Sequence, residues 1–153
     1  MTFALAASLG LAAWLALPQA SSNAQGLAFL GQPVTTEQTA LGQQVYAANC
    51  AACHGAKLEG QPDWKRRLED GRMPAPPHDA SGHTWHHADR QLFTIAKLGI
   101  GAVVPGYESD MPVFAGVLTD DEIAAALAWI KSTWPARQRN FQAEVTANDG
   151  GGS

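Results

Sequence analysis

The sequence predicts an all-α fold with three main helices joined by long loops. Three segments repeat apolar residues at helical spacing, and each has a capping signal at one or both ends. No segment alternates apolar and polar residues, as a half-buried strand does, over a useful length. The chain has 153 residues, a length that fits one domain once its two ends are set aside.

The first two helices are expected on either side of a long loop. The first runs from about residue 36 to residue 48, with Thr36 as a candidate N-cap. The second runs from residue 88 or 89 to residue 98, and Gly99 is a natural C′ residue. Their apolar stripes are Leu41, Val45 and Ala48 in the first helix and Leu92, Ile95 and Ala96 in the second.

The third helix has the clearest start and stop signals. Thr119-Asp120-Asp121-Glu122 is a capping box with additional acidic residues in the first turn. Ile123, Leu127 and Ile130 then fall on one face, and Pro135 ends the helix. The sequence therefore predicts an amphipathic helix directly after Thr119.

The two ends of the chain differ in composition from its centre. Phe3 to Leu17 is almost wholly apolar and is followed by small residues, which favours a signal peptide or an N-terminal membrane anchor over residues 1–24. Residues 25–35 are expected to be a linker, residues 36–137 the folded domain, and residues 138–153 a flexible tail. Either reading of the first segment places the domain outside the cytoplasm.

The charge of the chain excludes one class of partner. The net charge is −4, whereas phosphate binding needs concentrated lysine and arginine. The basic cluster Lys65-Arg66-Arg67 is followed at once by Leu68-Glu69-Asp70, so it is interpreted as a solvated turn. We therefore expect no nucleic-acid partner.

Both cysteines of the chain lie in the pentapeptide Cys50-Ala51-Ala52-Cys53-His54. Two thiols at this spacing can add to the two vinyl groups of haem, and the adjacent histidine can then ligate the iron. The pattern predicts one covalently attached haem c, with Cys50, Cys53 and His54 as its binding residues. A haem also explains the long Pro-, Gly- and His-rich stretch from residue 55 to residue 87, which would wrap around it.

The cysteine pair has two alternative interpretations. A thioredoxin-like redox pair needs a βαβ context, and the preceding segment is predicted to be helical. A zinc site would add two of the histidines His54, His78, His83, His86 and His87, whose spacing is not that of a usual zinc finger.

A carrier of electrons needs a second axial ligand on the iron, and Met111 is the leading candidate. It precedes Pro112 in a loop just before the third helix, and a thioether favours reduced iron and raises its potential. Met73 has a similar setting but follows His54 closely in the sequence. A histidine among His83, His86 and His87 is the third alternative.

The chain resembles the class I, mitochondrial-type cytochromes c of bacteria. The resemblance covers about residues 42–134 and rests on Gly42-x3-Tyr46-x3-Cys50-Ala51-Ala52-Cys53-His54-Gly55, Met111-Pro112-Val113-Phe114, Leu118-Thr119-Asp120-Asp121-Glu122-Ile123 and Trp129-Ile130-Lys131-Ser132. It implies that the first and last helices cross at Gly42, with Tyr46 against the 126–130 face. It also implies that the carbonyl of Pro76 or Pro77 accepts a hydrogen bond from His54.

The resemblance implies a one-electron carrier, not an enzyme, that exchanges electrons with redox protein partners in a periplasmic or respiratory chain. One alternative is a membrane-anchored module that donates electrons to an oxidase or a copper enzyme. An alternative of another class is a haem-based enzyme or ligand sensor, which would need an open iron site. The segment over residues 60–87 is longer and richer in histidine and tryptophan than in compact members of the family. The resemblance therefore assigns no role to Trp64 and Trp85.

Overall fold

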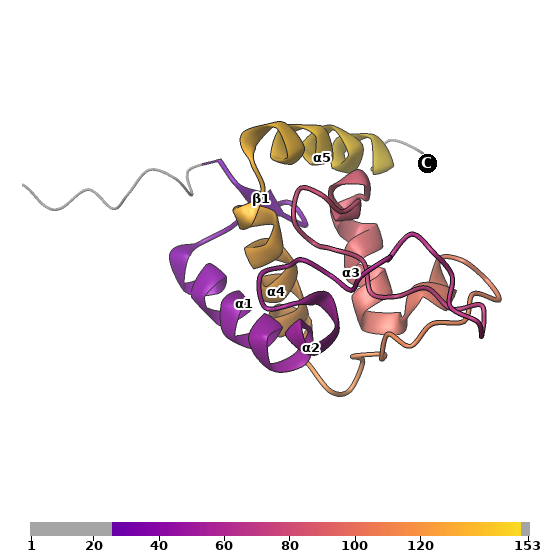
Figure 1. Cartoon of the computed structure of the whole chain (residues 1–153). Coiled ribbons are helices and arrows are strands. Elements are labelled where there is room, and N and C mark those ends of the chain that lie inside the picture. The colour runs from indigo at the N-terminus through magenta and orange to yellow at the C-terminus, as the bar shows by residue number, and fades with distance from the viewer. Residues whose placement is uncertain (1–25, 151–153) are drawn as a thin grey trace, which may run out of the picture.

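The computed structural model describes residues 26–150 and confirms the predicted all-α class (Figure 1). Between these residues the α-helices are α1 (Thr36–Asn49), α2 (Ala51–His54), α3 (Asp89–Leu98), α4 (Asp120–Thr133) and α5 (Ala136–Asp149). Two short 3-10 helices, η1 (Thr84–His86) and η2 (Ile100–Ala102), flank α3. Two-residue strands β1 (Ala28–Phe29) and β2 (Gln32–Pro33) form an antiparallel hairpin before α1, with Ala28 opposite Pro33.

Helices α1 and α4 cross in close contact, as the resemblance implied. A Cβ atom at Gly42 would overlap the backbone carbonyl of Ala125 in α4, so only glycine permits this approach. Next to the crossing, the rings of Tyr46 and Trp129 lie 4.8 Å apart between their centroids. The predicted contact of Tyr46 with the 126–130 face is therefore confirmed.

The helix ends follow the predicted capping signals, with one correction. The hydroxyl of Thr119 accepts from the Glu122 backbone N–H, and the Glu122 carboxylate accepts from the Thr119 N–H, so the predicted capping box is confirmed. The N-cap of α1 is Thr35 rather than Thr36, because the Thr35 hydroxyl accepts a 3.1 Å hydrogen bond from the Gln38 N–H.

Two apolar clusters lie on either side of α4. One joins α1, α3 and α4 with the loop after α2 and contains Tyr46, Leu58, Leu92, Ile130 and Trp134. The other joins the N-terminal hairpin to α4 and contains Phe29, Val34 and Ala128. Helix α4 is thus covered on both faces, and its residues Ala125 and Ala128 are fully buried.

The prediction of a linker over residues 25–35 is wrong for residues 26–35, which contain the β1–β2 hairpin. Leu30 and Gly31 have φ values of 50° and 77°, which close the tight hairpin between β1 and β2. Phe29 is only 3% exposed, because it packs against α4. The burial of this aromatic ring orders a segment whose Gln- and Gly-rich composition suggested a linker.

The predicted flexible tail is also wrong over the length of α5, which lies across the ends of α3 and α4 (Figure 1). Gln142 is fully buried and donates to Asp89 Oδ1 at 2.6 Å. Asp89 forms a buried ion pair with Lys131 of α4 at 3.0 Å and accepts from the Leu30 N–H. One buried carboxylate therefore ties α3, α4, α5 and the hairpin together. A polar anchor of this kind gives no apolar periodicity in the sequence.

The predicted signal peptide or anchor over residues 1–24 lies outside the described residues. Within residues 26–150, no helix is long and apolar enough to cross a membrane.

Candidate functional site

The cysteine motif lies on a single helical turn that follows α1. Cys50 ends α1, where its N–H donates to the Tyr46 carbonyl, and its own carbonyl accepts from the His54 N–H at 3.0 Å. Residues three apart in such a turn share one face, so Cys50 and Cys53 point to the same side. Cys50 is half-buried and Cys53 is exposed, and both are free thiols. Burial raises the pKa of Cys50 to about 11, so this thiol is protonated at neutral pH.

His54 ends the turn with its ring buried and its tautomer fixed. Its Nδ1–H donates to the carbonyl of Pro76 at 2.8 Å, so Pro76 rather than Pro77 is the partner that the resemblance implied. Because a carbonyl can only accept, Nδ1 carries the proton and Nε2 keeps a lone pair for a metal. Burial lowers the pKa of His54 below 6.5, partly offset by this hydrogen bond. The ring is therefore neutral at pH 7, as a metal ligand must be.

The chain on either side of the cysteine motif forms hydrogen bonds with the carbonyls of His54 and Gly55. The Tyr46 hydroxyl donates to the Gly55 carbonyl at 2.8 Å, and Gly55 has a φ of 84° that favours glycine. The Gly60 N–H donates to the His54 carbonyl. These bonds join α1 to the start of the long loop and fix the backbone on both sides of the His54–Gly55 peptide.

A second histidine lies on the face of His54. The two rings are nearly parallel, with 4.0 Å between the ring centroids of His54 and His78 and 25° between their planes. Burial is the main cause that lowers the pKa of His78 well below 6.5, with smaller contributions from His54 and His83. Sequence reasoning considered His78 only as a zinc ligand. Its place directly after Pro76-Pro77 was the available signal that it lies near His54.

Met111 lies in the loop between η2 and α4, where it is half-buried. Its N–H donates to the Ser109 hydroxyl at 3.1 Å. The residues that follow run along the end of α3, since the Phe114 and Ala115 N–H groups donate to the carbonyls of Ala96 and Lys97. The part of the loop that follows Met111 is thus bonded to the end of α3.

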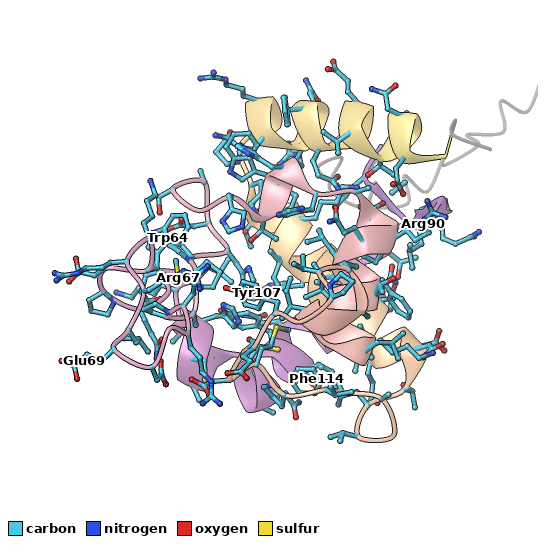
Figure 2. The ribbon with its side chains drawn as sticks, turned by 90° about the vertical axis from the view of Figure 1, so that its right-hand side faces the viewer. Trp64, Arg67, Glu69, Arg90, Tyr107 and Phe114 are labelled. Atoms are coloured by element: carbon cyan, nitrogen blue, oxygen red, sulfur yellow. The ribbon has the colours of Figure 1, made fainter. Side chains whose placement is uncertain are left out.

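Met73, the alternative thioether, lies in a loop that contacts the Met111 loop. Arg72 forms a 2.8 Å ion pair with Asp110, which precedes Met111. Arg67 lies over the ring of Tyr107 at 5.9 Å from the ring centroid, and the labels of the two residues stand next to each other in Figure 2. Met73 is half-buried like Met111. The structure brings the two candidate loops together, and the choice of ligand stays a prediction.

The described residues also offer polar groups suited to a haem. Arg72 Nε and Trp85 Nε1 are buried donors with no hydrogen-bond partner among residues 26–150. Buried donors normally have a partner, and the propionate carboxylates of haem are acceptors of the required kind. Two thiols on one helical turn, next to a neutral histidine that has a free Nε2, are the groups that covalent attachment of a haem requires.

The remaining histidines pack on aromatic rings. His83 stacks on Trp64 with 5.4 Å between ring centroids, and His86 contacts Trp85 and Phe141. Nδ1 of His87 is 3.1 Å from the Gln91 side-chain oxygen. Within the described part of the chain, no group of three or more His, Cys, Asp or Glu residues is arranged to hold a metal ion. The zinc alternative therefore has no ligand cluster there.

Comparisons with known proteins show which family the chain is similar to. The family model described as "Cytochrome c" matches residues 39–134. The chain is 33% identical over 95 residues to the cytochrome c6 of Tetradesmus obliquus, a match that covers 60% of this chain and 85% of the relative. No solved structure matches the chain significantly.

Proposed function

Because this chain belongs to the cytochrome c family and is a haem-based electron carrier, we propose that its iron is closed by two axial ligands, His54 and Met111. The observation that carries the proposal is the fixed tautomer of His54. Its Nδ1–H is held by Pro76, and this leaves Nε2 as the only ring nitrogen able to bind iron. When bound, haem c supplies an iron that alternates between the ferrous and ferric states.

Cys50 and Cys53 would anchor the haem by thioether bonds. Their common face on one helical turn, next to His54, supports this role. A pyridine haemochrome spectrum combined with the intact mass reports the number of haems and the number of thioether links. We expect one haem with two links in the wild type and one link in Cys50→Ala or Cys53→Ala. Two links in either variant would contradict the assignment.

Met111 would provide the second axial ligand from a loop fixed against α3. A thioether is a weak donor that favours ferrous iron, so it raises the potential. Met111→Ala is expected to abolish the weak red-edge absorbance of ferric iron–sulfur bonding and to lower the potential. Met73→Ala is the matched control, because it removes the same side chain from the neighbouring loop. If Met73→Ala alone loses the band, Met73 is the ligand.

Closed axial coordination also separates a carrier from a haem enzyme or ligand sensor. An iron with two protein ligands binds external molecules slowly, because a ligand must leave first. We therefore expect slow binding of carbon monoxide to the ferrous wild type and faster binding to Met111→Ala. Rapid binding to the untreated wild type would favour the enzyme or sensor instead.

The carrier would exchange electrons with redox proteins outside the cytoplasm, since haem is attached to such motifs after export. The net charge of −4 favours partners with a basic patch. Transfer rates to such a partner should fall as salt rises, because ions screen surface charges. A membrane-anchored module that feeds an oxidase is the second candidate, and it is favoured by the apolar segment Phe3–Leu17. Fractionation distinguishes the two, because an anchored chain stays with the membranes.

A further inference from the structure

His78 is placed to control the orientation of the His54 ring. The centroids of the two rings are 4.0 Å apart and their planes are inclined by 25°, so His78 covers a face of His54 rather than its edge. Nε2 of His54 lies in the plane of its ring, and a neighbour on the face therefore leaves that nitrogen accessible.

The hydrogen bond to Pro76 does not by itself define the plane of the His54 ring. It fixes the position of Nδ1, which lies 2.8 Å from the Pro76 carbonyl oxygen. The torsion that turns a histidine ring has broad minima, so the plane can still rock about this bond. A flat ring packed on its face restricts that rocking.

His78 is itself held by three separate parts of the fold. Its Nδ1 is 2.7 Å from the Thr84 hydroxyl of η1. Its carbonyl accepts from the Trp134 indole N–H at 2.7 Å, and Trp134 is the buried C-cap of α4. Its N–H donates to the Leu58 carbonyl at 2.8 Å. The two backbone bonds hold the His78 main chain against α4 and the loop after α2, and the Thr84 hydroxyl fixes the orientation of the His78 ring.

We propose that His78 is a positioning residue that sets the plane of the His54 imidazole and thereby the electronic structure of the ferric haem. The inference rests on the proposed role of His54 as an axial ligand. The orientation of an axial imidazole determines which iron orbital holds the unpaired electron. Groups around a metal ligand that fix its orientation are a recognised means of tuning the metal.

The test compares ferric holoproteins by the paramagnetic proton shifts of the haem methyl groups, which report the imidazole plane. His78→Leu removes the flat ring and should change the spread and order of the four methyl resonances. His78→Phe keeps a flat ring and should remain closer to the wild type. His86→Leu is the matched control, because His86 contacts Trp85 and Phe141 rather than His54, and it should leave the pattern unchanged.

A milder variant tests the same inference if His78→Leu does not fold. Thr84→Val removes the hydroxyl that fixes the His78 ring and should shift the methyl resonances in the same direction by a smaller amount. A wild-type pattern in the folded His78→Leu protein, or in Thr84→Val if the former does not fold, would overturn the inference even if stability falls. A His54→Ala holoprotein with an unchanged low-spin spectrum would contradict the proposed function and, with it, this inference.

Discussion

Buried contacts hold the helices of this molecule together, whereas exposed contacts hold its loops together. On one side, α1 and α4 meet through backbone contact at Gly42, and a buried carboxylate joins α3, α4 and α5. On the other side, the loops around Met73 and Met111 meet through an exposed ion pair and a cation–π contact. The difference indicates that the helices carry most of the stability of the fold, whereas the loops of the two candidate thioether ligands are joined by exposed contacts.

The largest effect should follow from breaking the buried ion pair of the frame. Lys131→Met leaves the Asp89 carboxylate buried without its cation, which should lower the free energy of unfolding by about 3–5 kcal/mol. Guanidinium denaturation of the holoprotein measures this. The exposed pair of Lys97 and Asp120 gives the control, since Lys97→Met should cost at most about 1 kcal/mol.

The double variant Asp89→Asn/Lys131→Met sharpens that result. Removing both charges eliminates the unpaired carboxylate, so part of the lost stability should return. No recovery would indicate that the lysine acts through packing rather than charge.

The next largest effect concerns the crossing of α1 and α4. Gly42→Ala places a methyl group against the Ala125 carbonyl, and overpacking of this kind typically costs about 1–3 kcal/mol. The matched control is Gly101→Ala, where the nearest atom to the new methyl group is 3.8 Å away. Thermal unfolding should show a clear loss only in the first variant. Equal melting temperatures would contradict the close approach of the helices.

A smaller effect is expected on the loop side. Asp110→Asn removes the ion pair with Arg72. The side chain of Arg72 is 39% exposed and that of Asp110 is 64% exposed, so the free energy of unfolding should fall by at most about 1 kcal/mol. If the pair holds the Met111 loop, the red-edge band should weaken in this variant and in high salt. Glu108→Gln serves as the control, because Glu108 forms no ion pair within the described residues. An unchanged band in Asp110→Asn would leave the pair without influence on Met111.

The smallest effect is the pH dependence of the capping box. Hydrogen bonds from the Thr119 backbone and side chain lower the pKa of Glu122 below 4.5. The folded state therefore holds the ionised form, and its stabilising contribution is present above about pH 4.5 and lost as the pH falls through the folded pKa. Glu122→Gln cannot titrate, so the melting temperature of the wild type should fall slightly more between pH 5 and pH 3. Equal falls would show that the ionised carboxylate adds nothing to the cap.

The sequence alone predicted α1, α3, α4 and the first half of the site. The capping box at Thr119 and the stop at Pro135 defined α4 because caps are local interactions. Cys50, Cys53 and His54 were recognisable because the attachment chemistry requires adjacent residues. Family resemblance further implied that Pro76 or Pro77 accepts from His54, and the structure assigns that bond to Pro76.

The rest depends on contacts between distant parts of the chain. The order of α5 comes from Gln142 bonding to Asp89, and the hairpin is ordered by Phe29 packing beside Ala128. The stacking of His78 on His54 joins residues separated by a loop that lacks any periodic pattern. The sequence by itself identified Cys50-Ala51-Ala52-Cys53-His54 as a haem-attachment motif, since that chemistry is local. Only the tertiary structure decided what holds His54 in place, because hydrogen bonds and ring stacking require the chain to be folded.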